Sequence, residues 1–174
     1  MRERVTEPRL QEFMRALALN VEQEGRVYLA GGGCAVLLGW RTSTLDVDIK
    51  VFPEQDEILR AIASLKESLN MNIELASPDD FIPPLPGWQN RSRFIVRQGK
   101  VSFHHYDFYA QALAKIERGH DIDQDDVRRM LEAGLVESAK LLVLFHAIEP
   151  ELYRYPAIGP QRFRRAVESA TQHR

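Results

Sequence analysis

Apolar residues recur at helical spacing at the start of the chain and again in its last third. From Pro8 to about Glu24 they fall three or four positions apart with charged residues between them, which predicts an amphipathic first helix. The same spacing returns after Asp107 and predicts four more helices. These are expected at residues 108–118, 124–133, 137–148 and 159–170. We therefore expect the C-terminal third to be helical throughout.

Between these two regions, shorter apolar runs are typical of strands. The run Val27–Ala30 ends at three glycines and predicts a short buried strand. Residues 45–52 alternate apolar and polar side chains with a period of two, which is the clearest strand pattern in the chain. Three further strands are expected at residues 72–75, 94–97 and 101–104. Gly99 lies between the last two and predicts a β-hairpin.

Two helices and one long loop are expected between these strands. Residues 34–38 form an apolar run that closes at Gly39, and an apolar stripe after Pro53 predicts a helix to about residue 69. Residues 77–90 hold four of the nine prolines, so a long loop without a helix is expected there. The fold class that follows is α/β (α+β), a mixed β-sheet flanked by helices with a helical C-terminal tail.

The composition is that of a folded, soluble protein. Charged residues make up 28% of the chain and the formal net charge is -2, which excludes a global positive field for nucleic acid. No signal-peptide pattern opens the chain and no apolar stretch of about 18 residues predicts a membrane span. The single cysteine, Cys34, excludes an internal disulfide and is expected in the core. We expect a cytoplasmic protein that does not contact a membrane.

Asp46 and Asp48 stand two residues apart in the clearest predicted strand. Residues at this spacing point to the same face, so the two carboxylates are expected side by side while Val47 and Ile49 enter the core. Adjacent carboxylates repel each other, and a hard divalent cation relieves the repulsion. Mg²⁺ binds one or two carboxylates while phosphate oxygens and water complete its shell. The pair predicts a magnesium site, and the alternative is two solvated acids on an exposed strand face.

Gly31, Gly32 and Gly33 directly follow the first predicted strand. Glycine allows a positive φ and a close approach of the backbone to a ligand, and the next helix offers N–H groups to an anion. A phosphate suits this arrangement, and a tight turn without a ligand is the alternative. The run lacks the third glycine of a dinucleotide-binding fingerprint and the Gly-Lys-Ser/Thr of a Walker A loop.

Together these motifs resemble the polymerase-beta-like nucleotidyltransferase superfamily. The resemblance comprises the apolar strand, the glycines, Arg41 and Thr44 before the Asp46–Asp48 pair, and Lys115 in a later helix. It covers about residues 25 to 135. Within the superfamily, the chain looks most like a bacterial branch that includes abortive-infection nucleotidyltransferase toxins, which suggests a toxin–antitoxin or phage-defence context.

The resemblance also implies how the chain divides. Residues 1–135 would form the nucleotidyltransferase-like domain, and residues 136–174 would form a helical C-terminal extension packed on it.

The resemblance implies a ligand role for the acids and the glycines. Asp46 and Asp48 would hold the Mg²⁺ that bridges a nucleoside triphosphate and its acceptor. The glycine turn would lie against the triphosphate, and Gly33 stands where many members of the superfamily carry serine.

Three further residues are assigned to the nucleotide in the same way. Arg41 and Thr44 would shape the loop before the acids, and Lys115 would neutralise phosphate charge. Lys115 has a second explanation, shared with Arg118, because cations near a helix C-terminus complement the helix dipole.

A third carboxylate, common among active members on a neighbouring strand, is not evident in the sequence. The expected position falls on Ser102, with His104 on the same face, and neither is an acid. Glu74 and Asp107 are two substitutes between which the sequence does not choose. A missing third ligand weakens a two-metal mechanism.

The function that the sequence favours is a Mg²⁺-dependent transfer of a nucleotidyl group from a nucleoside triphosphate to an acceptor hydroxyl or phosphate. RNA, a protein side chain and a small molecule remain open as acceptors, and a protein partner fits the resemblance. The competing hypothesis is a catalytically reduced nucleotide-binding or antitoxin-like regulatory protein with the same fold. A purely structural interaction protein is the third alternative.

Overall fold

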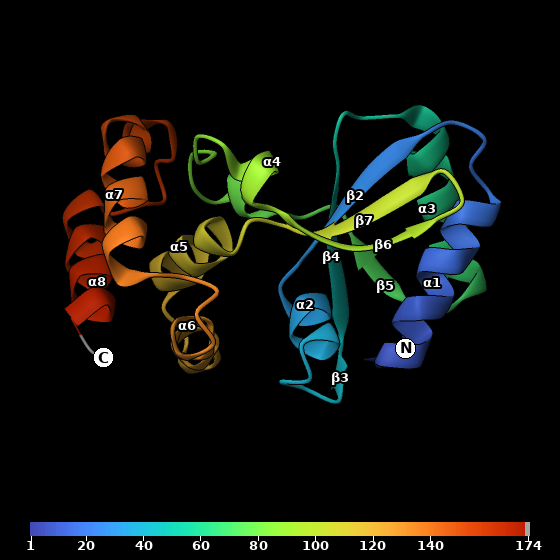
Figure 1. Cartoon of the computed structure of the whole chain (residues 1–174), viewed down its shortest axis with the longest axis horizontal. Coiled ribbons are helices and arrows are strands. Elements are labelled where there is room, and N and C mark those ends of the chain that lie inside the picture. The colour runs from blue at the N-terminus through green and yellow to red at the C-terminus, as the bar shows by residue number, and fades with distance from the viewer. Residues whose placement is uncertain (173–174) are drawn as a thin grey trace. The chain divides into compact units, whose positions relative to one another are not determined.

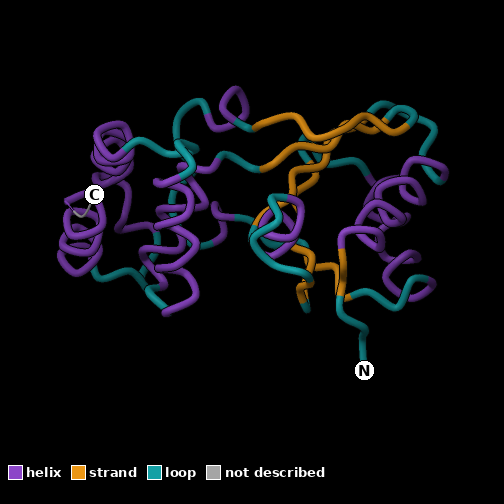
Figure 2. The backbone as a smooth tube through the Cα atoms, turned by 60° about the horizontal axis from the view of Figure 1, so that its bottom comes forward, coloured by secondary structure: helices purple, strands orange, loops and turns teal. Residues whose placement is uncertain are grey.

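A computed structural model describes residues 1–172 and confirms the predicted fold class, with a five-stranded mixed sheet flanked by helices and a helical C-terminal region (Figure 1). The chain forms two compact units. The first contains residues 1–77 and 92–106, and the second contains residues 78–91 and the chain from Asp107 onward. Every strand within the described residues belongs to the first unit, whereas the second unit is built from helices and loops (Figure 2). The domain boundary that the sequence analysis placed after residue 135 stays a prediction.

The sheet of the first unit has the strand order β5-β4-β2-β7-β6. Its strands are β2 (Gly25–Ala30), β4 (Asp46–Val51), β5 (Asn72–Glu74), β6 (Arg93–Gln98) and β7 (Val101–His105). Strand β2 runs antiparallel to β4 and parallel to β7, while β5 runs parallel to β4. The antiparallel pair β6 and β7 is the predicted hairpin. All five predicted strands are therefore confirmed.

Three helices belong to this unit: α1 (Glu7–Leu19), α2 (Gly32–Leu37) and α3 (Asp56–Ser68). Helix α1 was expected to reach about Glu24 but ends at Leu19. The cause is local, because the Asn20 amide donates to the carbonyl oxygen of Ala16 at 2.7 Å and so satisfies one of the last carbonyls of the helix. Two short strands, β1 (Val5–Thr6) and β3 (Ser43–Thr44), pair antiparallel outside the main sheet.

The core of the first unit lies between one face of the sheet and helices α1 and α3, which lie side by side in Figure 1. Register places Val27 and Leu29 of β2 on the same face as Val51 and Ile49 of β4, and all four are buried. Leu10 of α1 is fully buried on this side. Because side chains alternate along a strand, the opposite face carries Asp46 and Asp48.

The second unit contains five α-helices within the described residues. They are α4 (Trp88–Arg91), α5 (Phe108–Arg118), α6 (Asp121–Glu132), α7 (Ser138–Ile148) and α8 (Pro160–Gln172). Two 3₁₀ helices, η1 (Pro78–Asp80) and η2 (Glu149–Arg154), complete the unit. The four C-terminal helices were predicted and are confirmed.

The expectation of a loop without helix at residues 77–90 is wrong at both ends. Helix η1 begins at Pro78, where proline suits a first helical position. Helix α4 begins at Trp88, directly after Gly87, whose φ is 75°. The prolines precede the helical turns instead of interrupting them, so their number did not exclude helix.

No helix within residues 1–172 has the length and apolar character needed to span a membrane.

Candidate functional site

The glycine turn and the aspartate pair lie next to each other in the first unit, as the sequence predicts. Ala30, the last residue of β2, pairs directly with Asp48 of β4. Gly31 follows with φ 64° and ψ −132°, a conformation that only glycine adopts without strain. A Cβ atom at Gly31 would lie 3.0 Å from Oδ2 of Asp48. The backbone of the turn therefore approaches the Asp48 carboxylate closely.

Gly32 lies against Thr44, one of the residues assigned to the nucleotide. A Cβ atom at Gly32 would lie 2.1 Å from Oγ1 of Thr44, so only glycine fits without a shift. The Thr44 hydroxyl donates to the carbonyl oxygen of Asp46 at 3.1 Å, and the residue is buried. Thr44 thus ties the glycine turn to the start of the acid strand, which agrees with its expected role in shaping the loop.

Gly33 has more room than its two neighbours. The nearest atoms to a Cβ at Gly33 are Cδ2 of Leu10 at 3.9 Å and Cγ1 of Val47 at 4.0 Å, which are ordinary contacts. A Cβ atom is therefore accommodated at this position without a clash. Arg41 lies in the loop between α2 and β3, where it is half-buried and its backbone N–H donates to Ala35 at 3.4 Å.

Asp46 and Asp48 lie on the polar face of β4. Burial alternates along the strand, with both aspartates half-buried and Val47 and Ile49 at 0% and 1% exposure. This confirms that the two carboxylates share a face while the apolar residues enter the core. Lys50 follows on the same face and pairs in register with Tyr28 of β2.

The edge strand β5 adds two polar residues beside this pair. Asn72 pairs in register with Asp46, and Glu74 pairs with Asp48, so all four residues share one face of the sheet. The Asn72 amide donates to Oδ1 of Asp46 and, at 3.0 Å, to Oε1 of Glu74. A third carboxylate is thus present on the strand next to the acid pair.

The other positions considered for a third acid are placed differently. Ser102 and His104 lie on β7, which pairs with β2 and not with β4. Asp107 is fully buried in the second unit, where it caps α5 and binds Arg91 in an ion pair of 2.7 Å. Burial raises the pKa of Asp107 although Arg91 acts to lower it. Only Glu74, of the four residues considered, is an acid on the strand that pairs with β4.

The donor set fits a hard cation but does not form a complete cage. Within residues 1–172, no three histidine, cysteine or acidic side chains converge as a preformed metal site. Carboxylate oxygens are the ligands that Mg²⁺ prefers, and one or two of them suffice when phosphate oxygens and water complete the octahedron. Asp46 and Asp48 meet that requirement. The oxygens of a bound triphosphate, together with water, would supply the remaining ligands.

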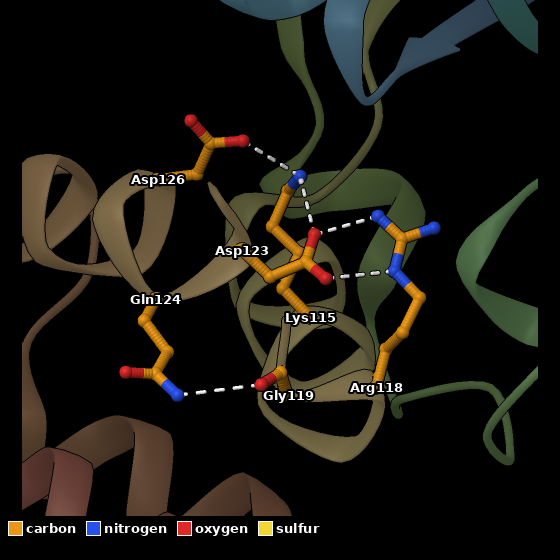
Figure 3. Close-up of polar contacts among 6 residues, drawn as sticks. All are labelled: Lys115, Arg118, Gly119, Asp123, Gln124 and Asp126. Carbon is orange, nitrogen blue, oxygen red and sulfur yellow. Dashed lines mark hydrogen bonds and ion pairs between the residues drawn. The ribbon is translucent and has the colours of Figure 1, made fainter. Parts of the chain in front are cut away.

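Lys115 belongs to the second unit and is held by a buried charge network (Figure 3). Its ammonium donates to Oδ2 of Asp126 at 2.9 Å and lies 3.7 Å from Oδ1 of Asp123. Arg118 donates two hydrogen bonds to Asp123, at 2.8 and 2.6 Å. The Lys115 side chain is only 10% exposed. The sequence offered two roles for Lys115, a phosphate contact and a complement to the helix dipole. Neither role includes an ion pair with these two aspartates.

The network balances two positive charges against two negative ones. Burial by itself would raise the pKa of Asp123, but the hydrogen bonds and charge of Arg118, together with the charge of Lys115, bring the pKa below its usual value. Asp123 is thereby stabilised as an anion in a buried position. The structure thus places Asp123 and Asp126, both in α6, in a charge network with two cations of α5.

His104 and His105 are adjacent residues of β7 and therefore point to opposite faces of the sheet. The His104 ring stacks on Tyr28 with the ring centres 5.2 Å apart. Nδ1 of His105 lies 3.1 Å from the sulfur of Cys34, which is buried in the core as expected. Burial, aided by the positive charge of Arg93, lowers the pKa of His105 to about 4. His105 is therefore neutral in the folded protein at neutral pH.

The sequence interpretation missed Asn72. A signal for it exists, because Asn72 and Glu74 repeat on β5 the two-residue spacing of Asp46 and Asp48 on β4. The parallel register that brings the two pairs together could not be read from either segment alone.

Comparison with known proteins gives one match. The profile of a family described as "Nucleotidyltransferase of unknown function (DUF6036)" matches residues 8–164. No curated protein and no solved structure matches the chain.

Proposed function

The chain belongs to the nucleotidyltransferase family DUF6036, and from this premise we propose that the polar face of β4 binds Mg²⁺ and a nucleoside triphosphate and transfers a nucleotidyl group to an acceptor. The observation that carries the proposal is the close approach of Gly31 to the Asp48 carboxylate, at a turn where only glycine fits. At this turn the backbone lies directly against the acid that would hold the metal. Family membership agrees with this use of the site.

In the first unit, some of these residues would bind the charged ligands, and others hold the glycine turn in place. Asp46 and Asp48 would bind the cation, and the backbone N–H groups that follow Gly31 would face the phosphates. Thr44 holds the turn against the acid strand through its contacts with Gly32 and the Asp46 carbonyl. Mg²⁺, when bound, supplies neutralisation of the triphosphate charge and polarisation of the α-phosphate.

In the transfer, the acceptor oxygen forms a bond to the α-phosphorus while the bond from that phosphorus to the bridging oxygen breaks. Pyrophosphate leaves with the electron pair, and the proton of a hydroxyl acceptor passes to water. The chain contributes position and electrostatic stabilisation to this step. Glu74, next to Asp48 in register, is the third carboxylate that we assign to the site.

A phosphate role for Lys115 remains part of the proposal and rests on the resemblance. The ion pair with Asp126 fixes the direction of the ammonium, which carries three N–H donors. Asp126 accepts from one of them and Asp123 lies 3.7 Å from the ammonium, so a phosphate would be a further anionic partner. Arg41 is proposed to act at the loop before the acids.

The biological context that we propose rests on the resemblance alone. The similarity to abortive-infection nucleotidyltransferases favours a toxin–antitoxin or phage-defence setting in bacteria. In that setting the acceptor would be RNA or protein, and a protein partner would control the activity.

The direct test is transfer of label from α-³²P-labelled triphosphates, supplied one at a time, to a lysate that contains total RNA and protein. We expect a labelled macromolecule with Mg²⁺ and none with EDTA or with the Asp48→Asn variant. Asp125→Asn is the matched control, because Asp125 is an exposed acid of the second unit that pairs with Arg128.

The competing function, a nucleotide-binding protein without turnover, gives a different result. It predicts Mg²⁺-dependent affinity for triphosphates in calorimetry but no labelled product with any acceptor. The observation that favours this alternative is that, among residues 1–172, no three acidic, histidine or cysteine side chains converge on one point. The absence of both binding and labelling would reject the site itself.

A further inference from the structure

Asn72 connects two acids that stand on neighbouring strands. Its side-chain amide donates one hydrogen bond to Oδ1 of Asp46 on β4 and one, at 3.0 Å, to Oε1 of Glu74 on its own strand. A primary amide carries two N–H donors, so both are used on carboxylates. Asn72 is half-buried, which shields these bonds in part from competing water.

The arrangement leaves the acids able to bind a cation. A carboxylate has two oxygens with about four acceptor sites, and Asn72 occupies one oxygen of each. The second oxygens of Asp46 and Glu74 are not needed for these bonds. A neutral amide between two anions also reduces their repulsion without adding a positive charge that would repel a metal ion.

Attachment of β5 to the sheet does not require the amide. The strand pairs with β4 through three residues in register, and its central residue, Ile73, is 3% exposed. The backbone ladder and the burial of Ile73 therefore hold the strand in place. The Asn72 side chain points instead to the polar face, where its contacts are with the two acids.

We propose that Asn72 is a positioning residue of the metal site, which fixes Asp46 and Glu74 in the orientation that binds the cation. The inference rests on the proposed function of the acid pair. Hydrogen-bond partners of metal-binding carboxylates commonly contribute tenfold to hundredfold in metal affinity. Asn72→Leu, which keeps the branched shape of the side chain and removes both donors, is expected to raise the Kd for Mn²⁺ by about tenfold.

The experiment measures Mn²⁺ binding by electron paramagnetic resonance, with and without α,β-methylene-ATP, on the full chain. Asn20→Leu is the control, because the Asn20 amide donates to a backbone carbonyl of α1 at 2.7 Å. It loses one comparable hydrogen bond and is expected to keep the wild-type Kd. Asp46→Asn is the positive control and is expected to weaken binding more than Asn72→Leu does.

Each result decides between the two proposals. If Asp46→Asn weakens Mn²⁺ binding and Asn72→Leu does not, the role of Asn72 is rejected and the function stands. If the wild-type chain binds neither Mn²⁺ nor the nucleotide, both are rejected. Equal weakening by Asn20→Leu would show a general loss of stability and reject the positioning role. Should Asn72→Leu not fold, Asn72→Ser, too short to reach both acids, takes its place with the same expected direction.

Discussion

The two units differ in how they hold the ionisable side chains that are shielded from water. The second unit pairs its buried Lys115, Asp123 and Asp126 in one network, which the exposed Arg118 joins. The first unit keeps its half-buried His105 neutral, next to the Cys34 thiol, and places Asp46 and Asp48 half-buried on the polar face of its sheet.

The difference separates two uses of acidic side chains. A pair of aspartates whose charge is matched by protein cations needs no ligand to complete it, and such a network holds helices together. In the first unit, Asp46 instead accepts a hydrogen bond from the neutral amide of Asn72. We therefore place the candidate metal site at Asp46 and Asp48 and not at Asp123 and Asp126, although both pairs are conspicuous in the sequence.

The largest effect is expected from breaking the charge balance of the second unit. Lys115→Met leaves Asp126 buried without its main cation, and removal of one partner from a buried ion pair costs about 3 to 5 kcal/mol. The free energy of unfolding in urea measures this loss. The double variant Lys115→Met/Asp126→Leu should recover much of it, because an apolar pair replaces the uncompensated charge.

The same Lys115→Met variant tests the proposed phosphate role under conditions in which it is folded. A direct phosphate contact predicts that triphosphate binding weakens by about 1 to 3 kcal/mol while nucleoside binding is unchanged. Unchanged affinity for both ligands would confine Lys115 to the network. Equal loss for triphosphate and nucleoside would reject a phosphate contact.

In the first unit, Asp48→Asn should act on binding and leave stability intact. We expect Mg²⁺-dependent triphosphate affinity to fall by about hundredfold, close to 2.7 kcal/mol, because one of the proposed metal ligands loses its charge. The melting temperature should stay unchanged or rise, since one of two repelling acids is removed. Calorimetry and thermal unfolding, with Asp125→Asn as the control, measure both. A large fall in melting temperature would contradict the comparison between the units.

Much of the first unit could be predicted because its signals are local. The period-two alternation at residues 45–52 and the glycine run indicated the acid strand and the turn, and pairing of Ala30 with Asp48 confirms that they are neighbours. Register between distant strands leaves no local signal, and so the position of Glu74 beside Asp48 stayed open.

The charge network of the second unit could not be predicted from the sequence, for a related reason. Lys115 and Asp126 are eleven residues apart on separate helices, and their pairing depends on how α5 and α6 pack. A lysine and an acidic helix start are each common on solvated surfaces. Their burial, at 9% and 5% exposure, is a property of the packed helices that neither segment shows alone.

A smaller effect is expected from the turn that supports the acid strand. Gly32→Ala places a methyl group 2.1 Å from Oγ1 of Thr44, and relief of this overlap should cost about 1 to 3 kcal/mol of unfolding free energy. Gly33→Ala is the matched control, because its methyl group meets only ordinary contacts. It should be neutral or stabilise by up to about 1 kcal/mol, since alanine restricts the unfolded chain. Equal costs for the two variants would contradict the close packing of Thr44 on the turn.

The smallest effect concerns the neutral histidine that distinguishes the first unit from the second. Burial lowers the pKa of His105 to about 4, with a contribution from Arg93, whereas an unfolded histidine titrates near 6.5. Between these values the unfolded chain binds more protons than the folded one, so stability rises with pH across this window and falls as pH decreases. The full shift would correspond to about 3 kcal/mol, and because His105 is only partly buried we expect about 1 to 2 kcal/mol.

The measurement is the unfolding free energy of the wild type and of His105→Gln from pH 7.5 to pH 4. The advantage of the wild type over the variant should shrink with falling pH and level off below about pH 4. His146→Gln, at an exposed histidine that faces Glu149, should not remove this slope. A pH dependence that survives in His105→Gln and disappears in His146→Gln would contradict the view that the first unit avoids buried charge by keeping His105 neutral.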